Sequence, residues 1–96
     1  MASRRPLLRE IIRQRRDELG MSVIQLAKAT GCSPESISNI EGGHEPIQGF
    51  RIKRLAGVLR LNREALSLYY LYESAPRLFR QTFGDITPPI PKPVSE

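Results

Sequence analysis

Residues 22–43 read SVIQLAKATGCSPESISNIEGG, and this stretch decides the fold. Ser22 is a good N-cap, because its side chain can accept a hydrogen bond from the first helical turn, and it predicts a helix over residues 23–29. Ser33, followed by a proline and an acidic residue, predicts a second helix over residues 34–41. The glycine between the two helices permits a backbone conformation that other residues resist. The stretch therefore predicts two short helices joined by a tight turn.

Apolar spacing predicts further helices on both sides of this pair. Upstream, Leu8, Ile12 and Leu19 fall near a helical spacing, and Gly20 ends that helix. Downstream, residues 44–49 form a loop before a fourth helix. The apolar positions of that fourth helix are Phe50, Ile52, Leu55, Ala56 and Leu59.

The last third of the chain predicts a fifth helix and an extension. Asn62 caps a helix over residues 63–73, and residues 75–83 indicate one more short helix. Four of the eight prolines lie in the tail from Thr87, which we expect to be extended or disordered. The predicted fold is all-α with about five main helices. It divides into a flexible basic arm over residues 1–5, a domain over residues 6–73 and a C-terminal extension over residues 74–96.

Positive charge gathers in the first part of the chain. The formal net charge is +5, and residues 1–60 hold eleven Lys and Arg against six Asp and Glu, whereas the remaining residues hold four of each. A basic domain attracts polyanions, of which nucleic acid is the commonest. A basic surface with no such partner would give the same counts.

Composition argues against several classes of site. Cys32 and His44 are the only cysteine and histidine, so no metal cluster with sensible ligand spacing can be assembled, and no catalytic Ser/His/Asp arrangement stands out. We expect neither enzyme activity nor a cofactor. No apolar run reaches the ~20 residues that span a bilayer, and we expect no secretory signal. A lone cysteine fits a reducing cytoplasm, so we expect a cytoplasmic protein.

Two short helices around a glycine turn form a helix-turn-helix, whose second helix enters the major groove of double-stranded DNA. The stretch over residues 8–46 also resembles the Cro/repressor-type (XRE) helix-turn-helix family, and the likeness covers roughly residues 6–70. It rests on Arg16, Gly20, Leu26, Ala27, Gly31, Ser33, Ile37, Ile40, Glu41, Gly43, Leu55, Ala56 and Leu59. The resemblance implies a lambda-repressor-like fold and a nucleoid-associated protein of bacterial, phage or plasmid origin. It also implies a transcriptional regulator, by default a repressor, that binds a palindromic operator as a homodimer through the helix over residues 34–41.

Two positions depart from the family's pattern. Val23 stands where the family usually has a glutamine that grips a phosphate, so this contact must be lost or left to the backbone N–H groups at that helix end. Gly42 stands where a large polar residue is common, which loosens the exit from the recognition helix.

The side of the recognition helix that would face the bases carries Pro34, Glu35, Ser36, Ser38 and Asn39. Asn39 can bond adenine in a bidentate way, Glu35 can accept from cytosine, and Ser36 can serve either kind of base edge. We predict Asn39 and Ser36 as the principal base readers, with Ser38 a weaker candidate. A solvated helix surface is the alternative for Asn39, and an acid at the start of a helix is favoured by the helix dipole alone.

Positive side chains and helix N-terminal donors beside that helix are candidates for phosphate contacts. They are Ser22, Val23, Lys28, His44, Arg51, Lys53 and Arg54, with Arg9 and Arg13 as weaker candidates. Arg4 and Arg5 could form an arm that reaches into a groove, although a disordered terminus fits equally well. The resemblance also implies a structural ion pair between Arg16 and Glu41 that joins the first and third helices.

The predicted fifth helix is apolar on more than one face, and the four short helices ahead of it can bury only one of them. Its excess apolar surface predicts a dimer interface at Leu66, Tyr69, Tyr70, Tyr72, Leu78 and Phe79. In the alternative arrangement, residues 75–84 fold back and cover this face within the monomer.

Two other functions stay open at this stage. An antitoxin would bind DNA and also hold a toxin, and the Pro-rich tail could be a segment that binds the protein partner. A protein-interaction module would keep the fold but have lost DNA binding, and Val23 and Glu35 favour that interpretation.

Overall fold

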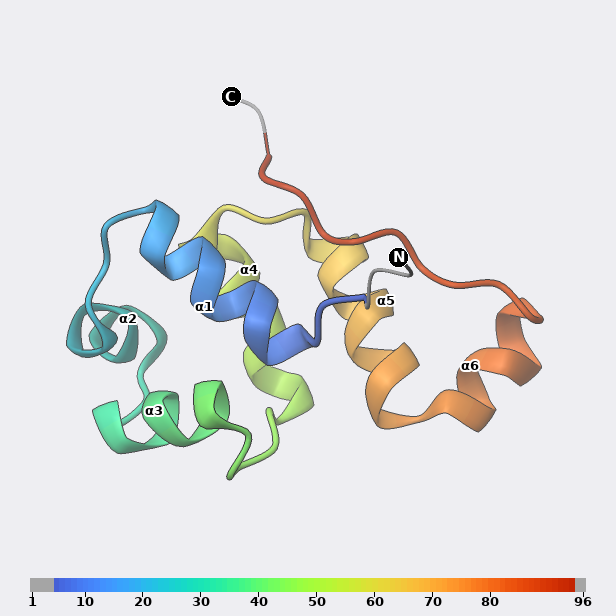
Figure 1. Cartoon of the computed structure of the whole chain (residues 1–96), viewed down its shortest axis with the longest axis horizontal. Helices are drawn as coiled ribbons and strands as arrows, with labels where there is room; N and C mark the ends of the chain where they lie inside the picture. The colour runs from blue at the N-terminus through green and yellow to red at the C-terminus, as the bar shows by residue number, and fades with distance from the viewer. Residues whose placement is uncertain (1–4, 95–96) are drawn as a thin grey trace.

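The computed structural model describes residues 5–94, and the regular elements within that range are all helical. They are α1 (Leu8–Glu18), α2 (Val23–Thr30), α3 (Pro34–Gly42), the short 3-10 helix η1 (Gly49–Arg51), α4 (Ile52–Leu59), α5 (Arg63–Ser74) and α6 (Pro76–Phe83). Figure 1 shows α2 and α3 towards one end of the long axis and α6 at the other end. The all-α class predicted from the sequence is therefore correct.

Helices α2 and α3 begin where their capping serines predict. Ser22 Oγ accepts the amide N–H of Gln25 at 3.0 Å, and Gln25 Oε1 accepts the amide N–H of Ser22 at 2.7 Å, so the two residues cap each other. Ser33 Oγ accepts the amide N–H of Ser36 at 3.1 Å. Gly31 ends α2 in the left-handed conformation, with φ at +72°. These bonds, each within a few residues of sequence, fix the turn between the two helices.

One apolar core joins α1 to α5. Leu26 of α2, Leu59 of α4 and Leu66 of α5 have no exposed surface, and Ile12 of α1 and Ile37 of α3 are almost as fully buried. Interiors of this kind are close-packed and resist deformation. The core therefore holds α3 in a fixed orientation against its neighbours.

Phe50 does not belong to this core. The apolar pattern of the fourth helix placed it inside, but its side chain is 75% exposed. Phe50 lies in η1, where three residues make a turn instead of 3.6, so the angular spacing of α4 does not extend back to it. The prediction was wrong at this position.

Helix α6 folds back onto α5 and covers part of the face that we expected to form a dimer. Phe79 is buried, and its ring meets the ring of Tyr72 edge-on at a centroid distance of 5.3 Å. Leu66 and Tyr69 are also buried within the protomer. The predicted dimer interface is therefore wrong at Leu66, Tyr69 and Phe79. The remaining predicted positions stay at least partly exposed: Tyr70, Tyr72 and Leu78.

The tail from Thr87 is extended and lies along the molecule. The amide of Val94 donates to the carbonyl of Arg60 at 2.8 Å, and the amide of Asn62 donates to the carbonyl of Lys92 at 3.1 Å. These bonds hold the tail beside the junction of α4 and α5, away from α3 (Figure 1). The outer face of α3 is consequently left open.

Arg5 is packed into the molecule. Its guanidinium lies over the ring of Tyr69, 5.4 Å from the centroid, and donates a hydrogen bond to the carbonyl of Pro88. The expectation that Arg5 reaches into a DNA groove is therefore corrected, because Arg5 is held between α5 and the tail. Arg4 and the rest of the expected arm lie outside the described residues.

Candidate nucleic-acid interface

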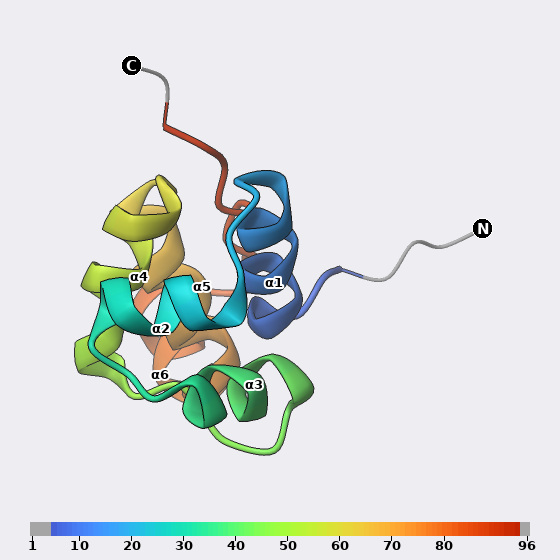
Figure 2. The same cartoon turned by 90° about the vertical axis from the view of Figure 1, so that its left-hand side faces the viewer.

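The two faces of α3 differ in burial. Ile37 and Ile40 are buried on the inner face, where α3 packs against α1 and α2. The outer face is exposed and consists of Pro34, Glu35, Ser38 and Asn39. Figure 2 views the molecule from the side on which α2 and α3 lie together. Four of the five residues predicted to contact bases are thus presented to solvent by a helix whose other face is anchored.

The fifth predicted base contact, Ser36, lies at the edge of this face. It is half-buried, and its Oγ lies 2.8 Å from Oε2 of Glu45. Glu45 follows α3 in the chain, and its amide N–H donates to the carbonyl of Asn39 at 3.2 Å. Any base that contacts Ser36 would therefore meet a hydroxyl that is already bonded to the Glu45 carboxylate.

An ion pair fixes α3 to α1. Arg16 Nε lies 2.8 Å from Oε2 of Glu41, and Arg16 Nη2 lies 2.9 Å from Oε1, so the contact is bidentate. Arg16 Nη1 also donates to the carbonyl of Met21 at 2.8 Å. The hydrogen bond to Glu41 raises the pKa of Arg16 above its ordinary value. The pair that the resemblance implied between these two residues is present in the structure.

The start of α2 offers backbone donors. Ser22 Oγ takes the amide N–H of Gln25, which leaves the first-turn amides of Val23 and Ile24 directed out of the helix end. The Val23 side chain is partly buried against the core and cannot grip a phosphate as a glutamine would. The backbone N–H groups and the helix dipole are what this end of α2 can present to an anion.

The basic residues predicted to contact phosphates fall into two groups. Lys28, Lys53 and Arg54 are exposed on α2 and α4, where a long cationic side chain can reach a backbone phosphate. Arg51 is half-buried instead, because its guanidinium stacks 5.1 Å from the ring centroid of Phe50 and donates to the sulfur of Cys32. These contacts hold Arg51 beside the turn between α2 and α3. The residues that line an open hollow at this turn are Thr30, Gly31, Phe50, Arg51 and Arg54.

The exit from α3 brings a histidine and an arginine close to the backbone. A Cβ at Gly42 would meet the His44 ring at 3.0 Å, and a Cβ at Gly43 would meet the Arg9 guanidinium at 3.0 Å. Arg9 also donates to the carbonyl of Glu41 at 3.3 Å. Glycines at both positions therefore let two cationic or titratable side chains pack over the end of the helix, and His44 stays exposed there.

Phe50 and Glu45 belong to this surface, although neither was predicted from the sequence to take part in DNA binding. Phe50 stacks with a predicted phosphate contact, and Glu45 bonds a predicted base contact. In the sequence, Gly49 directly before Phe50 could have indicated that the regular α-helix begins only after Phe50. No local signal links Glu45 to Ser36, because a loop separates them in sequence.

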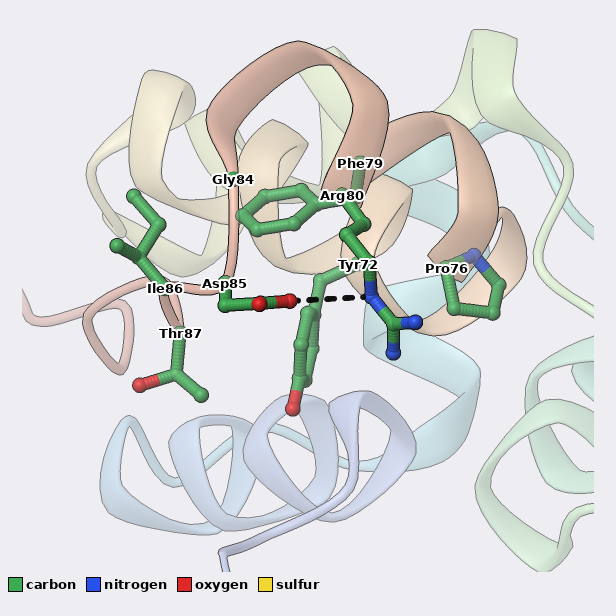
Figure 3. A pocket seen from close by; sticks show the side chains of 8 residues that line it. All are labelled: Tyr72, Pro76, Phe79, Arg80, Gly84, Asp85, Ile86 and Thr87. Carbon is green, nitrogen blue, oxygen red and sulfur yellow. Dashed lines mark ion pairs between the residues drawn. The ribbon is translucent and has the colours of Figure 1, made fainter.

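A second hollow lies at the opposite end of the molecule, between α5, α6 and the start of the tail (Figure 3). The rings of Tyr72 and Phe79 form its inner wall, and an ion pair between Arg80 and Asp85 crosses its edge at 3.3 Å. Both charged side chains are largely exposed, and exposed pairs contribute little to stability. The hollow presents no buried polar group that would orient a ligand.

Two further searches of the described residues bear on the class of protein. None of the helices over residues 5–94 combines the length and the apolar character that a membrane span needs. In the same part of the chain, no group of three or more His, Cys, Asp or Glu side chains is arranged to hold a metal ion.

A family comparison covers both helices of the turn and the core helices around them. The family model described as Helix-turn-helix matches residues 12–66, which is more than half of the chain. The chain belongs to the Cro/repressor-type (XRE) helix-turn-helix family. Searches of the curated proteins and of the solved structures find no match.

Membership of the XRE-type helix-turn-helix family settles the broad class of the protein. The family consists of DNA-binding regulators of transcription and is regulatory, not enzymatic. The matched residues include both partners of the Arg16–Glu41 pair and the whole of α3. The exposed polar face of α3 is accordingly the first surface to consider for contact with DNA.

Proposed function

We propose that the protein is a sequence-specific repressor that inserts α3 into the major groove of double-stranded DNA. The observation that carries the proposal is the open outer face of α3, on which Glu35, Ser38 and Asn39 are exposed while Ile37 and Ile40 anchor the helix from behind. A major groove admits one α-helix, and polar side chains on its outer face can reach base edges.

Exposed cationic groups outside α3 support the proposal. Lys28 extends from α2, which packs against α3, and Lys53 and Arg54 extend from α4, which packs against α2, so these helices carry groups that can neutralise phosphates. Such contacts fix the register of a protein on the duplex without reading its sequence. Arg51 and the α2 N-terminus add positions where a phosphate can be bound.

We also propose that two copies act together on a palindromic operator. One short helix reads few base pairs, and two copies related by a two-fold axis gain affinity and specificity. Among the described residues, most of the exposed large apolar side chains lie on and after α6. Leu78, Phe83 and Ile86 are each between 41% and 57% exposed, next to the half-buried Tyr72. Their exposure supports an interface there, in place of the buried residues predicted from the sequence.

The experiment that tests the proposal selects bound duplexes from a random pool with the full chain and then measures affinity across a salt series. We expect enrichment of a two-fold symmetric sequence and a dissociation constant that rises steeply between about 50 and 200 mM salt. A chain that retains no duplex at about 50 mM salt contradicts the proposal, because nonspecific binding by the phosphate contacts alone should be detectable there. A second polypeptide that copurifies would instead support the antitoxin alternative.

A further inference from the structure

The loop after α3 brings an acidic side chain to the edge of the recognition helix. The amides of His44 and Glu45 both donate to the carbonyl of Asn39, at 2.8 and 3.2 Å, and Gly43 turns the chain with φ at +81°. This folds residues 43–45 back along α3. The Glu45 carboxylate thereby comes within 2.8 Å of the Ser36 hydroxyl, nine residues earlier in the chain.

The hydrogen bond between these side chains has only one possible direction. An ionised carboxylate has no proton to give and can only accept, whereas a serine hydroxyl has one proton and two lone pairs. Ser36 must therefore donate to Glu45. Because the acceptor is charged, this bond is roughly twice as strong as one between neutral groups. Because its one proton is used in this bond, the Ser36 hydroxyl can only accept further hydrogen bonds.

This arrangement restricts what Ser36 can recognise. A serine without such a neighbour can turn its hydroxyl to donate or to accept, and so can bond any base edge. In the major groove, adenine and cytosine carry exocyclic amines that donate, whereas guanine N7 and O6 and thymine O4 only accept. A hydroxyl that must accept matches the amines of adenine and cytosine. Opposite guanine or thymine, the Ser36 hydroxyl must either break its bond to Glu45 or direct a lone pair at another acceptor, which forms no hydrogen bond.

We propose that Glu45 is a specificity-determining residue that acts through Ser36, so that the base which Ser36 faces must be adenine or cytosine. Glu45 is a positioning residue in this scheme, since it orients a hydroxyl and does not itself bond a base. The inference rests on the proposed function, because it needs α3 to lie in the major groove. It goes further by naming the base chemistry at one position of the operator.

The test is selection of bound duplexes from a random pool by the wild-type chain and four variants. Ser36→Ala identifies the operator position that the hydroxyl reads, because the preference at that position alone should be lost. Glu45→Ala frees the hydroxyl, and Glu45→Gln offers it an amide that can donate as well as accept. Glu64→Gln, at an exposed position at the start of α5, is the matched control for the loss of one negative charge.

We expect wild-type protein to prefer adenine or cytosine at that position by about five- to tenfold, the low end of the effect of one mismatched base pair. The preference should fall to about twofold or less in both Glu45 variants, while all other positions keep theirs, and it should be unchanged in Glu64→Gln. A loss of folding alone would weaken every position together, so a change confined to one position separates the proposed role from a structural one.

Three results would overturn the inference, and the third, which also overturns the proposed function, is distinguishable from the first two. If wild-type protein selects a sequence but both Glu45 variants keep the same preference at the Ser36 position, Glu45 does not set specificity although the proposed function stands. A wild-type preference for guanine or thymine at that position has the same consequence. If wild-type protein enriches no sequence at all, the proposed function fails and this inference fails with it.

Discussion

The guanidinium of Arg16 and the carboxylate of Glu41 meet through two parallel hydrogen bonds of 2.8 and 2.9 Å between α1 and α3. Both side chains are nearly buried, at 11% and 7% exposure. A buried pair with this geometry is costly to break, because removal of one partner leaves a charge without solvent or counter-ion. The pair therefore sets where the recognition helix sits relative to the first helix.

We predict that Glu41→Gln lowers the free energy of unfolding by about 3 kcal/mol, the low end for removing one partner of a buried pair. In a domain of this size that corresponds to a fall in Tm of roughly 12 °C or more. Urea denaturation followed by circular dichroism measures the free energy of unfolding, and a thermal melt followed by the same signal measures Tm. Glu18→Gln is the control, since Glu18 pairs with Arg15 at the surface and such pairs contribute about 1 kcal/mol or less. Equal decreases in the free energy of unfolding in Glu41→Gln and Glu18→Gln would show that the Arg16–Glu41 pair stabilises the fold no more than a surface pair does.

A second prediction concerns Lys53, which is exposed near the start of α4. If Lys53 neutralises one phosphate, Lys53→Gln lowers the slope of log affinity against log salt by about 0.9. It should weaken binding to specific and random duplexes by similar factors, because a phosphate carries no sequence information. Fluorescence anisotropy over a salt series gives the slope. Arg77→Gln on α6, at the far end of the molecule, should leave the slope unchanged (Figure 1).

The starts of the helices could be predicted because their signals are local. Ser22, Ser33 and Asn62 each accept an amide N–H from three residues further along, so the capping bond is complete within one turn of sequence. The family pattern added Arg16 and Glu41, which are far apart in the chain. Composition and spacing were thus sufficient for the helices and the turn, whereas the ion pair was predicted from the family resemblance.

The errors arose where burial depends on packing between distant segments. The apolar surface of α5 predicted a partner, but the sequence left open whether that partner was a second copy or the chain's own α6, which places Phe79 against Tyr72. The bond from Ser36 to Glu45 needs the left-handed turn at Gly43 to fold the loop back. Periodicity describes one helix at a time, so it could place neither of these contacts.

A third prediction concerns Asn39, whose side chain is exposed in the middle of the outer face of α3. A bidentate bond from its amide to adenine should contribute about 1–3 kcal/mol of discrimination. Asn39→Ala should therefore weaken binding to the selected operator by a factor of roughly 5 to 150 while leaving affinity for random duplex nearly unchanged. Gln81→Ala removes an exposed amide from α6 and should change neither affinity. Equal weakening on both kinds of duplex by Asn39→Ala would assign the residue to the phosphate backbone.

The last prediction concerns association of two copies through Leu78, which is 52% exposed on α6. Leu78→Asp places a charge in the proposed interface, where desolvation opposes burial, and should weaken dimerisation by about tenfold or more. Sedimentation equilibrium of the free protein and of the operator complex measures this change. In the free protein, Ile24→Asp is the matched control, because Ile24 is similarly exposed on α2, outside the proposed interface, and should leave the dimer intact. A wild-type chain that remains monomeric on its operator would contradict the proposal of a two-fold symmetric complex. An unchanged dimer in Leu78→Asp would show that the interface does not include α6.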